Sequence, residues 1–143
     1  MELVIKKFDE LSLNELYELM SLRVSVFVVE QNCIYQDLDG KDQSSYHLFL
    51  RDENGIQACM RIVPEDEGQM LFGRVIAVKR GQGLATKLLA SAKSFSKNEL
   101  GAKSARIIAQ LHAVPVYENV GFRQVSDQFI EYGIPRIIMS MDL

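Results

Sequence analysis

The chain has 143 residues, of which 48% are hydrophobic and 24% charged, and its mean hydropathy is close to zero. These values are typical of one compact soluble domain, and they exclude a disordered chain or a small fold that depends on disulfides. The 16 lysines and arginines against 19 aspartates and glutamates give a net charge of -3 without a basic block, which excludes nucleic acid as the main partner.

The cysteines and the lack of long apolar segments indicate in which cellular compartment the protein is expected. Cys33 and Cys59 are far apart in the sequence and have no metal-ligand spacing around them, which favours two free thiols in a reducing cytoplasm. A disulfide between them is the alternative. The first residues contain no apolar core of a signal peptide, and no uncharged apolar stretch reaches the roughly 18 residues of a membrane span. We therefore expect a cytoplasmic protein without a membrane partner.

The first predicted elements are a strand over residues 3–8 and a helix. Ser12 and Glu15 have the spacing of a capping box, which marks the start of that helix. Apolar residues then recur at intervals of three and four positions as far as Phe27. This periodicity predicts helical structure to about Glu30.

A polar loop over residues 32–45 follows the first helix. It contains Asp37, Asp39 and Asp42, a spacing that suggests calcium, but Leu48 stands where a calcium-binding EF-hand loop needs glutamate. The run therefore predicts a solvated acidic turn, which could attract a cationic amine, and no metal site.

Strands and helices then alternate to the end of the chain, without a repeat or a linker. An Asn-Gly pair between the first two strands indicates a tight hairpin, so the first three strands of this part are expected to be antiparallel. The predicted strands cover residues 45–50, 56–63, 69–78, 105–110, 123–130 and 136–143. The predicted helices begin at Leu84 and end near Gly101, and cover residues 113–120.

A glycine turn joins the strand that ends at Val78 to the helix that begins at Leu84. Arg80, Gly81 and Gly83 lie in this turn, immediately before the helix N-terminus. Backbone amides at a helix N-terminus have no partner within the helix, and glycines let an anion approach them closely. The turn is therefore suited to a pyrophosphate, although the spacing alone fits an ordinary glycine turn equally well.

Two familiar nucleotide motifs do not fit this turn. The P-loop pattern is absent, because Gly83 is followed by leucine rather than lysine. The dinucleotide fingerprint requires a third glycine where Thr86 stands and an acidic residue at the end of the next strand, where Gln110 stands. What remains is the pattern Arg/Gln-x-x-Gly-x-Gly/Ala, fulfilled by Arg80, Gly83 and Ala85.

This pattern resembles that of the GNAT superfamily of N-acetyltransferases, in which it binds the pyrophosphate of acetyl-CoA. A second run is similar to the family's segment after its fifth strand: Gln110-x-x-Ala113-x-x-x-Tyr117-x-x-x-Gly121-Phe122. The stretch from Leu22 to Gly40 and the later Gly133-Ile134-Pro135 are similar to the ElaA-like branch, so the likeness covers nearly the whole chain.

The resemblance implies one mixed α/β domain of the GNAT type over residues 1–143. It implies a central, mostly antiparallel sheet of about six to seven strands, with helices on both faces. The fourth and fifth strands are expected to splay apart and form a cleft for acetyl-CoA, which is used without a metal. The residues that the resemblance implies for acetyl-CoA binding are Ile76, Ala77, Val78, Arg80, Gly81, Gln82, Gly83, Leu84, Ala85, Thr86 and Gln110.

Two features depart from the family pattern. Only Val78 and Lys79 separate the fourth strand from Arg80, which is shorter than usual and leaves the register of that strand open. Arg136 stands where the ElaA-like branch often has histidine after Gly-Ile-Pro, so no role is carried over from that histidine.

The resemblance also implies that Tyr117 gives a proton to the departing CoA thiolate during direct attack by an amine. A lysine-like amine has a pKa of about 10.4, so forming its neutral state at pH 7 costs about 4.6 kcal/mol and calls for a base. Glu30 is our first candidate, because it lies beside the expected acceptor cleft, and a solvated helix-end carboxylate is the alternative. His47 is a second candidate, although a histidine within an apolar strand usually has a packing role. His112 is left unassigned.

The sequence thus predicts an N-acetyltransferase whose partners are acetyl-CoA and a primary amine of unidentified chemistry. The alternative is a module of the same fold that binds acyl-CoA or another protein without catalysis. The loops over residues 32–45 and 130–136 are expected to shape the acceptor site. The oligomeric state is open, and edge strands near the C-terminal end are suited to a homodimer.

Overall fold

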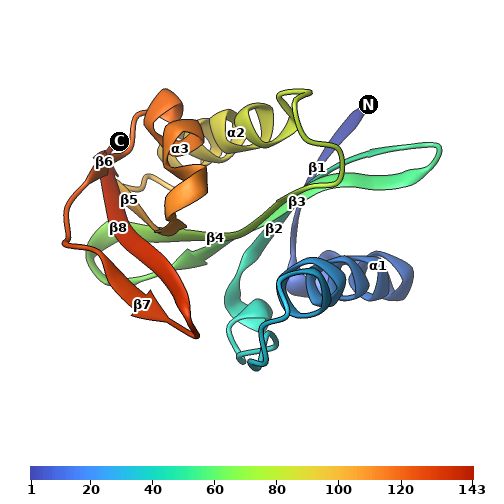
Figure 1. The fold of residues 1–143 in the computed structure, drawn as a ribbon. Helices are drawn as coiled ribbons and strands as arrows, with labels where there is room; N and C mark the ends of the chain where they lie inside the picture. The colour runs from blue at the N-terminus through green and yellow to red at the C-terminus, as the bar shows by residue number, and fades with distance from the viewer.

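The computed structural model describes residues 1–143 as one eight-stranded sheet with helices on both faces (Figure 1). The strands are β1 (Glu2–Lys7), β2 (Tyr46–Asp52), β3 (Gly55–Pro64), β4 (Gln69–Ala77), β5 (Ser104–Gln110), β6 (Arg123–Gln124), β7 (Phe129–Glu131) and β8 (Ile134–Asp142). The helices are α1 (Leu13–Arg23), α2 (Leu84–Asn98) and α3 (Val114–Val120). The mixed α/β class, the mostly antiparallel sheet and the helices on both faces are confirmed. None of the helices has the length and hydrophobicity needed to cross a bilayer.

The strands follow the order β1-β2-β3-β4-β5-β8-β6, and β7 pairs with the first half of β8. Every pairing is antiparallel except that of β4 with β5. The parallel pair extends only from Gln69–Ser104 to Phe72–Ile107, after which the two strands separate. The predicted splay between the fourth and fifth strands is therefore confirmed, and it opens a cleft at the centre of the sheet.

The start of α1 follows from the capping box predicted for Ser12 and Glu15. The Ser12 hydroxyl accepts a hydrogen bond from the Glu15 backbone at 3.0 Å, and the Glu15 carboxylate accepts one from the Ser12 backbone at 2.8 Å. The helix continues as a wider π-helical segment over Val24–Glu30, so helical structure reaches Glu30 as predicted. Leu19 of α1 packs with Phe49 and four other buried residues on one face of the sheet.

The larger core lies on the opposite face, beneath α2 and α3. Leu88, Leu89 and Ala92 of α2 are completely buried there. The buried residues of β5 alternate along the strand, so its even-numbered residues, Gln110 among them, point to the other face. This alternation decides which β5 side chains can reach the acceptor side of the cleft.

A bulge in β4 explains the splay. Phe72 belongs to the larger core and Ile76 to the smaller one, although strict alternation would place residues four positions apart on the same face. The register with β3 shifts between Cys59 and Arg61, and Arg74 has a left-handed φ of 53°. The bulge turns the second half of β4 over and away from β5.

The strand predicted over residues 123–130 is wrong as one element, because the structure divides it into β6 and β7. The Ser126 hydroxyl accepts a hydrogen bond from the Ile138 backbone at 2.8 Å and so replaces a main-chain partner of β8. The last strand begins at Ile134 rather than at residue 136, since Tyr132 and Gly133 adopt left-handed φ angles of 52° and 76° in a tight turn. Eight strands result in place of about six to seven.

Candidate active site

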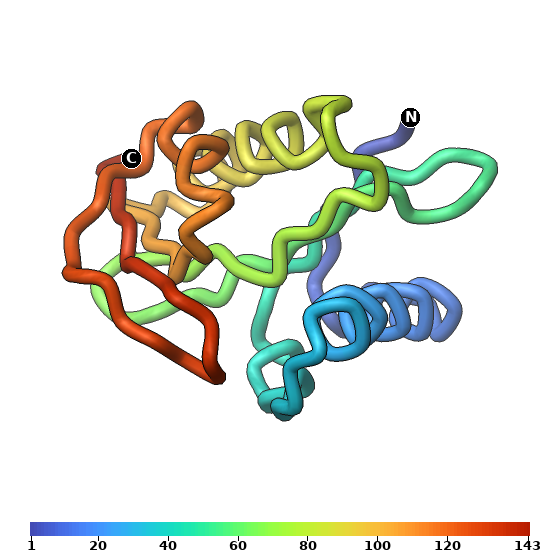
Figure 2. The backbone as a smooth tube through the Cα atoms, viewed as in Figure 1, coloured from blue at the N-terminus to red at the C-terminus, as the bar shows by residue number.

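A cleft of about 1020 Å³ lies where β4 and β5 separate. Its walls come from the second half of β4, the start of α2, the end of β5, and α3. The segment after α1 and the β7–β8 hairpin also line it, and Figure 2 shows these two parts of the chain facing one another across a gap. The loops predicted to shape the acceptor site thus lie at the same cleft.

The glycine turn forms one end of the cleft. Gly83 is the N-cap of α2 with a φ of 70°, and no side chain caps the helix. Gly81 also has a left-handed φ, of 79°, and an added Cβ at either glycine would meet no atom within 4 Å. The first amides of α2 are therefore open to an anion, as the sequence predicts, with Arg80 beside them at the cleft.

The second half of β4 supplies an unpaired strand edge along the cleft. The register is now defined, since Ala77 pairs with Ala58 of β3 and the Val78 amide donates to the Gln57 carbonyl at 2.9 Å. Of the residues expected to bind acetyl-CoA, these line the cleft: Ile76, Ala77, Val78, Arg80, Gly81, Gly83, Leu84, Ala85, Thr86 and Gln110. Gln82 is exposed and is not among the residues that line it.

Tyr117 lies in α3 with a buried ring and also lines the cleft. Its ring packs edge-on against Phe122 at a centroid distance of 6.3 Å. Burial raises the pKa of Tyr117 to about 12, against an opposing effect from the charge of Arg136. The hydroxyl therefore stays protonated at neutral pH.

The two candidate bases occupy different environments. Glu30 ends the π-helical segment, lines the cleft and is exposed. His47 is buried on β2, with its Nε2 atom 2.9 Å from the Asp42 carbonyl oxygen, and it does not line the cleft. Burial lowers the pKa of His47, so it is held as a neutral packing residue. Of the two, only Glu30 is brought to the cleft.

The acidic run in the loop is not a solvated turn, and that prediction is wrong. Arg23 contacts the carboxylates of Asp37 and Asp42 at 3.0 and 2.6 Å, and all three side chains are buried. Arg61 contacts Asp39 at 2.6 Å and Asp42 at 3.0 Å. The arginines come from α1 and β3, so their pairing with the loop could not be read from local spacing. These carboxylates do not face the cleft as free charges.

The network lowers the pKa values of two carboxyl groups, those of Asp39 and Asp42. Hydrogen bonds from Arg61 hold the pKa of Asp39 well below its usual range, although burial opposes them. Burial also tends to raise the pKa of Asp42, but hydrogen bonds and charge from Arg23 and Arg61 outweigh it and lower the value. The loop is therefore fastened to the sheet by charged groups that stay ionised at neutral pH.

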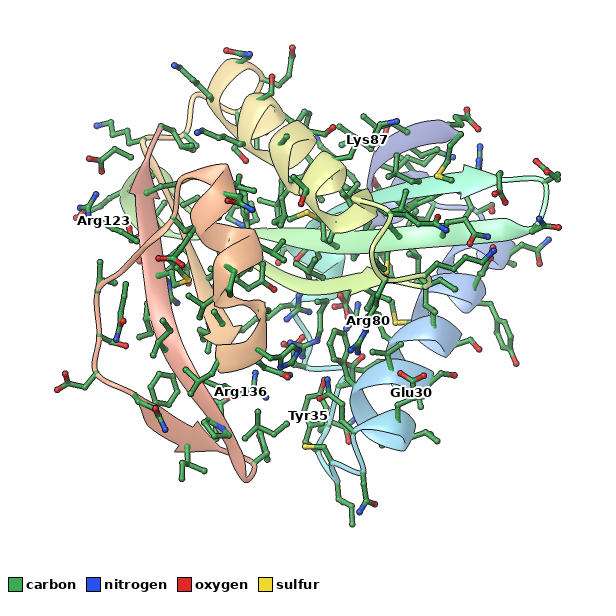
Figure 3. The ribbon with its side chains drawn as sticks, turned by 45° about the horizontal axis from the view of Figure 1, so that its top comes forward. Glu30, Tyr35, Arg80, Lys87, Arg123 and Arg136 are labelled. Carbon is green, nitrogen blue, oxygen red and sulfur yellow. The ribbon has the colours of Figure 1, made fainter.

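Several cleft residues were missed by sequence reasoning. Tyr35 and Tyr132 both line the cleft and pack with their rings tilted by 44° and their centroids 5.3 Å apart. Gln110 donates to Gln31 at 3.2 Å. Arg136 points from β8 into the space between α3 and Tyr35 (Figure 3). A signal existed for the tyrosines, which fall in the two loops expected at the acceptor site. Both cysteines are buried and free, so the alternative of a disulfide is wrong.

Comparisons with known proteins agree with this geometry. Residues 15–143 match the family model described as an acetyltransferase (GNAT) domain. A UPF0039 protein of Schizosaccharomyces pombe is 38% identical over 147 residues, covering 100% of this chain and 98% of the relative. The crystal structure of Escherichia coli ElaA has a TM-score of 0.89 and 32% identity, covering 98% of this chain and 99% of that one.

A crystal structure from Pseudomonas aeruginosa, described as an acyl-CoA N-acyltransferase, is similar to the same extent. It has a TM-score of 0.88 and 33% identity, and it covers 98% of this chain and 99% of that one. The family match covers most of the chain, and its sheet and helices are those expected for that fold. The chain therefore belongs to the GNAT acetyltransferase family, among the relatives of ElaA.

Proposed function

We propose that this protein is an N-acetyltransferase that moves an acetyl group from acetyl-CoA to a primary amine of a small molecule or peptide, by direct attack in a ternary complex. The observation that carries this proposal is the continuity of the cleft. It begins at the glycine turn, follows the unpaired edge of β4 and reaches Tyr117. The activity is assigned to a domain over residues 1–143 of a cytoplasmic protein and requires no metal.

The residues along the cleft fit the parts of acetyl-CoA. The open amides of α2 and the charge of Arg80 suit the pyrophosphate, and the bare strand edge from Ile76 to Val78 suits the amides of the pantetheine arm. Acetyl-CoA, when bound, supplies a thioester as the activated acetyl donor. Gly81 and Gly83 keep the surface above the helix N-terminus free of side chains.

In this proposal Glu30 is the general base and Tyr117 the general acid of the reaction. Glu30 accepts the proton that the amine loses, directly or through one water molecule. Tyr117 holds a proton at its hydroxyl oxygen for the sulfur that leaves, and burial keeps that oxygen protonated. Starting from the neutral amine, one proton leaves the nitrogen for Glu30 and one passes from Tyr117 to the sulfur. Transfer of a proton from Glu30 to Tyr117 through water restores both residues, and an amine that arrives as ammonium first releases one further proton to water.

Two measurements test this function. Calorimetry with acetyl-CoA measures binding, and we expect Arg80→Gln to weaken it by about two- to fivefold, a modest effect because Arg80 is exposed. Lys87→Gln is the matched control, since Lys87 is also exposed but lies on the outer side of α2 (Figure 3). Equal affinities in the two variants contradict the assignment of Arg80.

Release of the CoA thiol in the presence of an amine panel measures turnover. The panel contains polyamines, amino acids, aminoglycosides and peptides, and we expect at least one class to be acetylated. Binding of acetyl-CoA without turnover of any amine supports the alternative of a non-catalytic module. Failure to bind acetyl-CoA contradicts both functions.

A further inference from the structure

Arg136 is a cleft residue whose charge has no partner within the chain. It lines the cleft, its Nε atom is buried, and no group of the protein accepts a hydrogen bond from that atom. None of its nitrogen atoms takes part in an ion pair. A buried guanidinium nitrogen without an acceptor is costly, so it is expected to bind an acceptor that comes from outside the chain.

The other cations of the cleft have different roles. Arg61 and Arg74 are neutralised by Asp37, Asp39 and Asp42. Arg80 and its neighbour Lys79 lie in the glycine turn at the pyrophosphate end. Arg136 is therefore the cation of the acceptor end that forms no ion pair.

The register places Arg136 on the acceptor side of the sheet. It lies directly opposite Gln110, on the same face of the β5–β8 pair, and Gln110 reaches across to Gln31. The charge of Arg136 also tends to lower the pKa of Tyr117, so the guanidinium lies close to the proposed proton donor. Figure 3 shows Arg136 between α3 and Tyr35, with Glu30 on the opposite side of the cleft.

We propose that Arg136 binds a carboxylate of the acceptor, and that the acceptor is therefore an amino-acid-like molecule with its amine a few atoms from that carboxylate. The inference rests on the proposed function, because Tyr117 marks the place of the reacting thioester. Because the guanidinium lies near Tyr117, a short spacer between the carboxylate and the amine brings the amine to the thioester. Glu30 and Glu131 also line the cleft, so a zwitterion meets both signs of charge there.

The surrounding charges favour a carboxylate over a phosphate. A planar guanidinium can bind either group with two parallel hydrogen bonds. A phosphate carries close to two negative charges at neutral pH, whereas the acceptor end offers one unpaired cation and the nearby Glu131. The single charge of a carboxylate matches Arg136 alone.

The test compares matched acceptors that differ only in this group. Amino acids are assayed beside their carboxamides and their decarboxylated amines, in the wild type and in Arg136→Gln. In the wild type we expect kcat/KM for the carboxamide to be about 10- to 100-fold lower than for the acid, since hydrogen bonds to charged groups are strong. In Arg136→Gln we expect equal kcat/KM values for the acid and the carboxamide, and an unchanged affinity for CoA.

Arg123→Gln is the matched control, because it removes the same charge from the exposed strand β6, far from the cleft (Figure 3). A thermal melt of each variant shows that it is folded. Arg136→Lys retains a charge without the fork of a guanidinium and is expected to restore part of the preference for the acid. Equal kcat/KM for acids and amides in the wild type overturns the inference and leaves the proposed function intact.

A binding measurement separates the two proposals when no amine is acetylated. Calorimetry of the protein with CoA then compares an N-acetylated amino acid with its N-acetylated carboxamide. Tighter binding of the acid, lost in Arg136→Gln and kept in Arg123→Gln, supports the carboxylate site independently of turnover. Equal binding of the two compounds overturns it.

Discussion

Tyr117 combines a buried aromatic ring with a polar hydroxyl, and the residue lines the cleft. The ring belongs to the larger core, where it contacts Phe122, so its position is set by packing. Burial disfavours the phenolate and keeps the oxygen protonated. Packing therefore depends on the ring and the proposed proton donation on the hydroxyl, so a substitution can separate the two.

Replacement of Tyr117 by phenylalanine keeps the ring and removes only the proton donor. We expect kcat to fall by roughly 100-fold or more, within the usual range for a general acid, while acetyl-CoA affinity and stability stay close to wild type. Steady-state kinetics with a chemistry-limited acceptor, together with calorimetry, checks this. An unchanged kcat contradicts the role of Tyr117.

The wild-type pH profile gives a second check on the same residue. Because the pKa of Tyr117 is raised to about 12, the tyrosine remains protonated through neutral and mildly alkaline pH. We expect no loss of kcat from its deprotonation below about pH 10, where an ordinary phenol titrates. A fall in kcat near pH 8 that is absent from Tyr117→Phe contradicts this assignment.

At the scale of elements, the loop between α1 and β2 is held by ion pairs rather than by apolar packing. Asp37 and Asp42 are buried against Arg23, and Asp42 is shared with Arg61. Breaking a buried ion pair from one side leaves an uncompensated charge, which is strongly destabilising. The loop also carries Tyr35, which lines the cleft, so we expect the position of the loop to affect acceptor binding.

Asp42→Asn removes the shared carboxylate and leaves both arginines buried. We expect the free energy of unfolding at pH 7 to fall by about 3–5 kcal/mol, measured by denaturant titration. Asp127→Asn, at an exposed position, is the matched control and is expected to have little effect. An equal loss of stability in the two variants contradicts the role of the network.

The same variant has a predicted dependence on pH. The folded-state pKa of Asp42 is lowered, so its contribution to stability is complete above the unfolded value of about 3.9 and is lost as the pH falls through the folded value. The difference in stability between wild type and Asp42→Asn should therefore shrink as the pH is lowered below about 4. A constant difference in this range contradicts the assignment.

At the scale of the whole molecule, the cleft lies between two packed layers that β4 connects. Phe72 contributes to the core under α2 and α3, and Ile76 to the core under α1. The glycine turn and Tyr117 belong to the side of α2 and α3, whereas Glu30 and Tyr35 belong to the side of α1. A ligand in the cleft contacts both sides and should stabilise the native state as a whole.

Acetyl-CoA is expected to raise the melting temperature. Ligand at 100 times its Kd adds about 2.7 kcal/mol to the stability of the folded state. For a chain of this size that corresponds to roughly 5–10 °C. A thermal melt with acetyl-CoA measures the shift, which should be smaller in Arg80→Gln than in the wild type and the same in Lys87→Gln as in the wild type. No shift in the wild type contradicts a preformed site.

The sequence by itself determined the features that depend on neighbouring residues. The capping box at Ser12, the helix through Glu30, the hairpin before Gly55 and the glycine turn before Leu84 follow from local spacing, and all appear in the structure. Resemblance to the family added the splayed cleft and the place of Tyr117. Both come from short runs of residues, the glycine turn and the run from Gln110 to Phe122, which can be recognised in one sequence.

Only the tertiary structure decided which distant residues meet. The acidic loop was predicted to be solvated, because its partners Arg23 and Arg61 lie on other elements and no local rule pairs them with it. The bulge at Arg74 turns β4 over, and the register of β8 sets Arg136 opposite Gln110. Ion pairs, bulges and strand register depend on contacts between remote segments, which hydrophobic periodicity does not encode.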